Sequence, residues 1–200
     1  GNWKMNGLRR DGLDLARILS SRFAAAEGLG FEMALCPPFT LLDLVAGILG
    51  NSGVALGAQD CHAEQKGAHT GDVSAEMLAD IGCDYVIVGH SERRQTHREI
   101  DLAISLKAAA AHRAGLVSII CVGETEAERD AGRAREVVSR QLAGSVPTRS
   151  TAENTIVAYE PVWAIGTGLT PSVDDVAKAH AHIRQELARV VGAEAARMRI

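Results

Sequence analysis

The stretch YVIVGHSERR, residues 85–94, changes character at a single residue. Four apolar residues precede Gly89, and His90 and four polar residues follow it without a spacer. A continuous apolar run is typical of a strand buried on both faces, as in a parallel sheet. Ser91 and Glu92 indicate the start of a helix. The stretch therefore predicts a buried strand that passes through a glycine directly into a helix, with a histidine at the junction.

Other apolar runs repeat this pattern along the chain. Four further near-continuous runs predict strands at 31–36, 54–59, 117–123 and 155–160, and another begins at 197–200. Between them, helical spacing or composition predicts helices at 8–23 and 96–114, and capping boxes predict helices from Thr125 to about Gly144 and from Ser172 to Gly192. Alternating strands and helices predict an α/β fold with a parallel sheet, either open and doubly wound or closed into a barrel. Periodicity alone does not decide between these two.

Length and composition restrict the class of protein. A chain of 200 residues with 46% hydrophobic and 23% charged residues fits one soluble domain. The net charge of −4, without a basic block longer than a pair, argues against a nucleic-acid or anionic-membrane partner. No apolar run approaches the roughly 18 residues of a membrane span. The four cysteines are widely spaced in apolar surroundings, which predicts reduced, buried thiols rather than a disulfide framework or a zinc site.

Polar side chains gather where the predicted strands end, which is where parallel α/β folds bind ligands. His90 follows one strand, and Glu160 closes another ahead of Pro161. A carboxylate at a partly dry strand end can act as a general base. A helix start disfavours a positive ring, so a neutral His90 could donate a hydrogen bond to a substrate oxygen. Taken singly, each also fits a structural role: Glu160 as an acid paired with a cation, and His90 as a core histidine.

Two further segments carry candidate binding groups. The loop PVWAIGTGLTP, residues 161–171, has prolines at both ends and an apolar middle with Gly166, which suits a lid that offers backbone N–H groups to an anion. The alternative is an ordinary connection, although an exposed Trp and Ile there would be unusual. Near the start, an extended segment would place Asn2 and Lys4 on the same side. Lys4 could stabilise a phosphate or an oxyanion, or be a solvated surface lysine.

Taken together, these segments resemble the triosephosphate isomerase family. The matching segments occur in the family's order and spacing: GNWKMNG (1–7), GAQDCH (57–62), GAHTGDVSAEML (67–78), YVIVGHSERR (85–94), CVGET (121–125) and AYEPVWAIGTG (158–168). The resemblance implies the (β/α)8 barrel, with this chain covering roughly strands 1–6 and the start of strand 7. It also implies a cytoplasmic enzyme of glycolysis and gluconeogenesis that interconverts dihydroxyacetone phosphate and D-glyceraldehyde 3-phosphate without a metal or organic cofactor.

The resemblance also implies a role for each candidate residue. Glu160 would move the proton between the two substrate carbons. His90 would polarise the carbonyl and move protons between the two oxygens. Lys4, with Asn2 beside it, would stabilise enediolate and phosphate charge, and Gly166 would donate a backbone N–H to the phosphate. Ser91 and Glu92 would lie behind these catalytic residues and hold them in place without contacting the substrate.

The resemblance further implies a homodimer. The segment from Gln59 to Thr70 corresponds to the family's interdigitating loop, with Thr70 at its tip. Relative to the family, residues 1–200 form a single barrel domain that is incomplete at both ends. Gly1 falls inside the usual span of the family's first strand, and phosphate-binding loops of the family would follow Ile200. Two alternatives to an active isomerase therefore remain: a catalytically incomplete fragment or assembly module of the same fold, and another phosphate-handling barrel enzyme.

Overall fold

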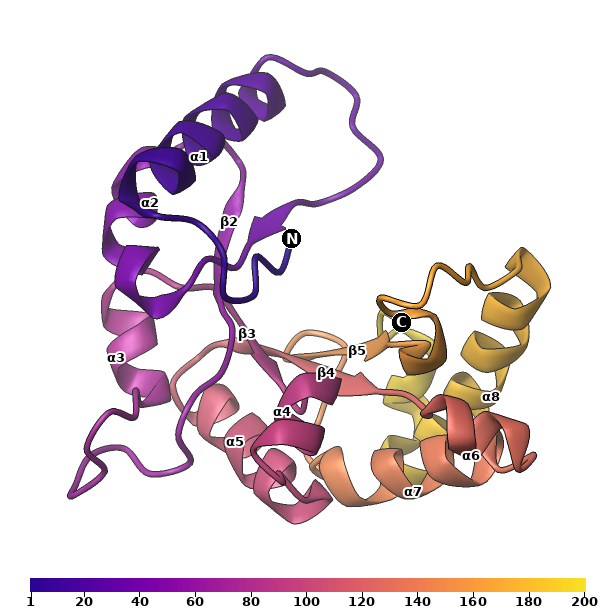
Figure 1. Ribbon diagram of the computed structural model, residues 1–200. Helices are drawn as coiled ribbons and strands as arrows, with labels where there is room; N and C mark the ends of the chain where they lie inside the picture. The colour runs from indigo at the N-terminus through magenta and orange to yellow at the C-terminus, as the bar shows by residue number, and fades with distance from the viewer. The chain divides into compact units, whose positions relative to one another are not determined.

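A computed structural model describes residues 1–200 (Figure 1). Its contacts group the chain into two compact units. The first comprises Gly1–Ile87 with Ala110–Val117, and the second comprises Val88–Ala109 with Ser118–Ile200. None of the helices combines the length and the apolar character that crossing a bilayer requires.

The first unit is built on parallel strands β1 (Ala34–Leu35), β2 (Ala55–Ala58) and most of β3 (Tyr85–Val88). Ala34 pairs with Ala55, and Gly57 pairs with Tyr85. The helices that precede or connect these strands are α1 (Arg9–Ala24), the short 3-10 helix η1 (Phe39–Leu41), α2 (Leu42–Leu49) and α3 (Ala75–Asp80). In Figure 1, α1 and α2 lie along the same side of β2. α2 presents an apolar stripe to the core, in which Leu42, Val45 and Leu49 are buried. The buried positions of α1 are instead the small residues Gly12, Ala16 and Ser20.

The second unit contains most of β4 (Val117–Val122) and all of β5 (Thr155–Tyr159), which pair in parallel from Ser118 with Thr155 to Val122 with Tyr159. Its helical elements are α4 (Ser91–Thr96), most of α5 (Asp101–Arg113), α6 (Glu126–Asp130), α7 (Ala134–Ser145), η2 (Val162–Ala164), α8 (Val173–Val191) and η3 (Gly192–Ala196). α7 packs against α8. The core of this unit is formed by fully buried apolar side chains, among them Ile120, Leu142, Val157, Ile183 and Leu187.

The predicted strands are confirmed, since each observed strand lies within its predicted run. Near the end of the chain, Arg199 forms a parallel bridge with Ile156, in agreement with a strand beginning at 197–200. Both capping boxes are present, at Thr125 with Glu128 and at Ser172 with Asp175. The four cysteines are free and buried, as predicted.

Two predicted helices are wrong in extent. The helix expected over 96–114 begins only at Asp101, because Arg98 adopts a left-handed φ of 56°. Glu99 lies in the turn between α4 and α5 and forms ion pairs with Arg93 at 2.7 Å and with Lys107 at 2.6 Å. These ion pairs join the two helices across residues that were expected to be helical. The helix expected from Thr125 to Gly144 is two helices, α6 and α7. They separate at Gly132, whose φ of 70° ends α6 in the usual left-handed manner. The short helices α2 and α3 had no sequence prediction.

Candidate active site

His90 and Glu160 lie together in the second unit, each directly after a strand. His90 follows Gly89 at the end of β3, and Glu160 follows Tyr159 at the end of β5. Nε2 of His90 is 2.7 Å from Oε1 of Glu160, and both side chains are largely shielded from solvent. The other carboxylate oxygen of Glu160 accepts a 2.9 Å hydrogen bond from the backbone N–H of Ser91. The carboxylate is thus held at both oxygens by two consecutive residues of the strand-to-helix junction.

The backbone of α4 determines which ring nitrogen of His90 carries the proton. The N–H of Glu92 donates to Nδ1 at 3.3 Å, so Nδ1 acts as an acceptor and the proton of the neutral ring lies on Nε2. The carboxylate of Glu92 also lies 3.6 Å from Nδ1, but this distance exceeds hydrogen-bonding range and the side chain is 55% exposed. We therefore assign the backbone N–H as the partner of Nδ1. With this tautomer, Nε2 donates to Glu160.

Arg94 holds the junction in place, and it was not among the predicted site residues. Its Nε donates to the carbonyl of Gly89 at 2.8 Å, and its terminal nitrogens contact Asp101, Ser145 and the carbonyl of Cys121. One largely buried guanidinium therefore connects the ends of β3 and β4 with α5 and α7. The sequence signal available was the Ser-Glu-Arg-Arg run, but helical spacing alone suggests a solvated arginine at this position.

The predicted lid has a buried beginning and an exposed middle. Trp163 is only 8% exposed. The guanidinium of Arg129 stacks on its ring at 4.2 Å, which explains how the indole is covered. Ile165 is 42% exposed, and Gly166 follows with a φ of 74°. Only glycine adopts that backbone conformation readily, so Gly166 determines the course of the loop.

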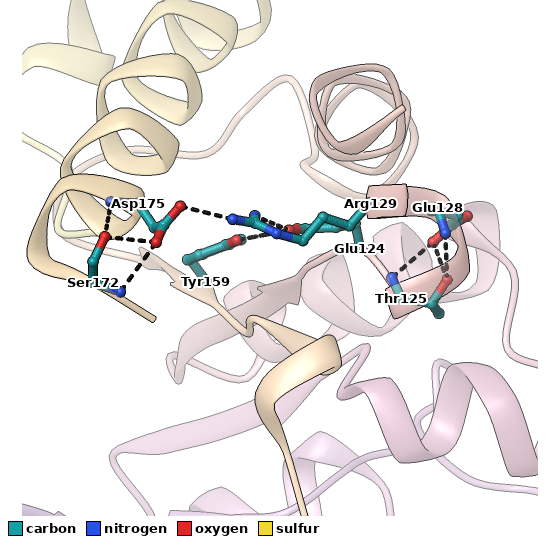
Figure 2. A network of polar contacts seen from close by, with 7 residues as sticks. All are labelled: Glu124, Thr125, Glu128, Arg129, Tyr159, Ser172 and Asp175. Atoms are coloured by element: carbon teal, nitrogen blue, oxygen red, sulfur yellow. Dashed lines mark hydrogen bonds and ion pairs between the residues drawn. The ribbon is translucent and has the colours of Figure 1, made fainter. Parts of the chain in front are cut away.

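A polar network connects the strand ends beside the lid (Figure 2). Glu124, which is 1% exposed and follows β4 by two residues, accepts hydrogen bonds from the Tyr159 hydroxyl at 3.0 and 3.1 Å. Arg129 on α6 contacts Glu124 at 3.3 Å and Asp175 on α8 at 2.7 Å. The network therefore ties the residue that precedes Glu160 to two helices.

The pKa values of two members of this network are shifted. Burial, reinforced by the Glu124 charge, raises the pKa of Tyr159 to about 12. Hydrogen bonds from Ser172 and then Arg129 lower the pKa of Asp175 to about 2. At neutral pH the tyrosine is consequently a stable donor, and Asp175 is a stable acceptor.

Asn2 and Lys4 belong to the first unit, and their backbone differs from the prediction. The segment is not extended at Lys4, which has a left-handed φ of 55°. Oδ1 of Asn2 accepts from the Lys4 N–H at 2.9 Å, and Nε2 of Gln59 donates to the carbonyls of Lys4 and Cys36 at 2.9 and 2.8 Å. Asn2 therefore shapes the turn on which Lys4 lies. A left-handed non-glycine residue is held only where its surroundings demand it, and such residues cluster at functional sites.

The segment from Gln59 to Thr70 is a loop with an anchored base and an exposed tip. The His62 N–H donates to the carbonyl of Val73 at 2.8 Å, and Thr70 is exposed. His62, His69 and Asp72 place possible metal ligands within 4.8 Å of one another. However, Nδ1 of His62 accepts from the Glu64 N–H at 3.0 Å, which leaves the proton on Nε2, the atom facing Asp72. A ligating nitrogen carries no proton, so this arrangement does not favour a metal ion.

Comparison with known proteins identifies the family of this chain. The family model described as triosephosphate isomerase matches residues 1–200. A curated triosephosphate isomerase from a Chelativorans species is 56% identical over 200 residues, covering all of this chain and 78% of that protein. Another, from Afipia carboxidovorans, is 59% identical over 187 residues, covering 94% of this chain and 74% of that protein. The crystal structure of triosephosphate isomerase from Bartonella henselae matches with a TM-score of 0.90 and 44% identity, covering all of this chain and 78% of that one. This chain therefore belongs to the triosephosphate isomerase family, whose fold is the (β/α)8 barrel.

Proposed function

We propose that this protein interconverts dihydroxyacetone phosphate and D-glyceraldehyde 3-phosphate, with Glu160 as the base. The observation that carries the proposal is the 2.7 Å contact between Nε2 of His90 and the Glu160 carboxylate. It joins a proton acceptor and a neutral proton donor at two strand ends, which are the two groups that this isomerisation requires. A glutamate base combined with a neutral histidine donor is the known pairing of groups for this reaction.

The proposed chemistry consists of proton transfers alone. Glu160 removes a proton from the carbon beside the substrate carbonyl, and the electron pair of that C–H bond forms the double bond of an enediolate. The Nε2 proton of His90 stabilises the charge that develops on the carbonyl oxygen. A proton moves from the hydroxyl of the first carbon to the former carbonyl oxygen, with His90 passing it between the two oxygens. Glu160 then returns its proton to the former carbonyl carbon, which completes the exchange of aldehyde and ketone. No electrons leave the substrate, so the reaction as written needs no redox cofactor.

The contacts of Glu160 suggest how the carboxylate is held before substrate binds. Both carboxylate oxygens are already hydrogen-bonded, to His90 and to the Ser91 N–H. A substrate carbonyl that accepts the Nε2 proton of His90 replaces Oε1 as its partner. The carboxylate is then free to turn toward the C–H bond. In this proposal Ser91 holds the base, and Glu92 maintains the tautomer of His90 through its backbone N–H.

We assign substrate binding to Asn2, Lys4 and Gly166. Lys4 supplies positive charge to the phosphate and the enediolate, from a backbone turn that Asn2 and Gln59 maintain. Gly166 supplies a backbone N–H to the phosphate. Its left-handed conformation in the exposed part of the lid supports this role, because consecutive N–H groups in such turns form anion-binding sites.

We also propose that the protein is a cytoplasmic homodimer. The exposed tip of the loop from Gln59 to Thr70 is the surface that would enter a second subunit, with Thr70 at the tip. Four free, buried cysteines fit a reducing compartment. Light scattering coupled to size-exclusion chromatography should give twice the 21.1 kDa chain mass. A Thr70→Arg variant should shift the protein toward monomer, and a wild-type monomer would contradict the proposal.

A coupled assay tests the function directly. Conversion of D-glyceraldehyde 3-phosphate to dihydroxyacetone phosphate is followed through NADH oxidation by glycerol-3-phosphate dehydrogenase. Wild-type protein should turn over, and Glu160→Gln, which removes the base while retaining its shape, should lose at least about a thousandfold in kcat. A folded wild-type chain without turnover would instead support the alternative of a non-catalytic module of the same fold.

A further inference from the structure

The backbone of Glu160 lies directly against Gly123, the residue that follows β4. The Glu160 N–H donates to the carbonyl of Val122 at 2.8 Å, which extends the β4–β5 pairing by one step beyond β5. A Cβ atom added to Gly123 would lie 1.8 Å from the carbonyl oxygen of Glu160 and 2.8 Å from its carbonyl carbon. Both are backbone atoms and cannot rotate away. Glycine at position 123 is therefore what allows the peptide of Glu160 to occupy its place.

Gly123 is in turn held by a single side chain from α7. Oε1 of Gln141 accepts from the Gly123 N–H at 2.8 Å, and Nε2 of Gln141 donates to the Gly123 carbonyl at 3.1 Å. Gln141 is only 6% exposed. Both ends of its amide thus bind one residue, in the manner of a neighbouring strand. At this point β4 has ended, and the side chain supplies hydrogen-bond partners to partly buried backbone groups.

We propose that Gly123 and Gln141 are positioning residues for Glu160. This inference rests on the proposed function, in which Glu160 is the base. The Glu160 carboxylate is fixed at one end by His90 and Ser91, and its backbone is fixed at the other end by Val122 and Gly123. Gln141 determines where Gly123 lies, so it controls the base through the backbone without touching substrate. A misplacement of about 1 Å in a reacting group can cost roughly a hundredfold in rate.

The experiment compares three variants of the full chain. Gln141→Met keeps the length of the side chain but removes both hydrogen bonds to Gly123, and Gln141→Glu keeps only the acceptor for the Gly123 N–H. Arg140→Met is the matched control on the same helix, since Arg140 is largely exposed and pairs only loosely with Glu128, at 3.9 Å. We expect Gln141→Met to lower kcat by about ten- to a hundredfold with KM within about twofold. Gln141→Glu should fall between this variant and wild type, and Arg140→Met should match wild type.

A second measurement separates positioning from a general loss of structure. In protein labelled with 15N-histidine, the ring signals of His90 report its contact with Glu160. They should shift in Gln141→Met, whereas those of His62, in the first unit, should not. Wild-type kcat and unshifted His90 signals in folded Gln141→Met would overturn the inference. If Gln141→Met does not fold, the same wild-type values in Gln141→Glu would overturn it.

The two proposals can fail separately. An inactive wild-type protein would refute the proposed function. The His90 ring signals would still test whether Gln141 determines the position of Glu160, because that measurement needs no turnover.

Discussion

Shortening Glu160 to aspartate tests the geometry of the base with its chemistry unchanged. Glu160→Asp retracts the carboxylate by one carbon–carbon bond, about 1.5 Å. The present 2.7 Å contact with Nε2 of His90 would lengthen to roughly 4 Å, beyond hydrogen-bonding range. The backbone cannot move forward to compensate, because the Glu160 N–H is bonded to Val122 at 2.8 Å and its carbonyl lies against Gly123.

The expected loss follows from that displacement. At roughly a hundredfold per ångström, a retraction of about 1.5 Å should lower kcat by about 10² to 10³. This corresponds to about 3–4 kcal/mol in activation free energy. KM should change by less than about threefold, because the proposed phosphate-binding groups are untouched.

The coupled assay measures both constants at saturating and limiting substrate. Glu153→Asp is the matched control, since it makes the same change in a side chain that is 67% exposed and pairs with Arg197 at 3.1 Å. Its kcat should equal that of wild type. If Glu160→Asp also retained the wild-type kcat, the assignment of Glu160 as the base would be wrong.

Three further predictions concern the helix cap and the polar network beside the lid. Thr125→Ala removes the side-chain cap of α6 and should lower the unfolding free energy by about 0.5–2 kcal/mol in urea denaturation; no change would show that the cap is not needed. Tyr159→Phe removes the donor to buried Glu124 and should cost about 1.5–3 kcal/mol in the same assay, whereas a neutral result would mean that another donor replaces it. The lowered pKa of Asp175, about 2 in the folded protein against an ordinary 3.8, makes its ionised form stabilising above pH 3.8. Thermal denaturation should therefore show wild type above Asp175→Asn at neutral pH, with the gap closing as the pH falls from about 4 toward 2; a gap independent of pH would contradict this.

The elements that sequence analysis predicted correctly are those determined by neighbouring residues. A strand buried on both faces needs only a run of apolar side chains, and each predicted run contains an observed strand. A capping box joins residues three positions apart. The boxes of Thr125 with Glu128 and of Ser172 with Asp175 can therefore be predicted from the sequence without knowledge of the fold. His90 could be placed at the junction of β3 and α4 for the same reason.

The errors arose where distant contacts outweigh local preference. Alanine-rich spacing favoured a helix from residue 96, but Glu99 bridges Arg93 and Lys107 across a turn. Gln141 carried no signal at all, because a glutamine on an amphipathic helix is most often solvated.

By itself, the sequence determined the order of strands and helices, the junction at His90 and membership of a family, because these depend on local pattern and on matching segments. The tertiary structure decided that Ser91 and Glu160, 69 positions apart, meet at 2.9 Å. It also decided that Gln141 and Gly123 support the backbone of Glu160. Such contacts depend on how strands and helices pack, and the free energy of packing is shared among residues that no local pattern connects.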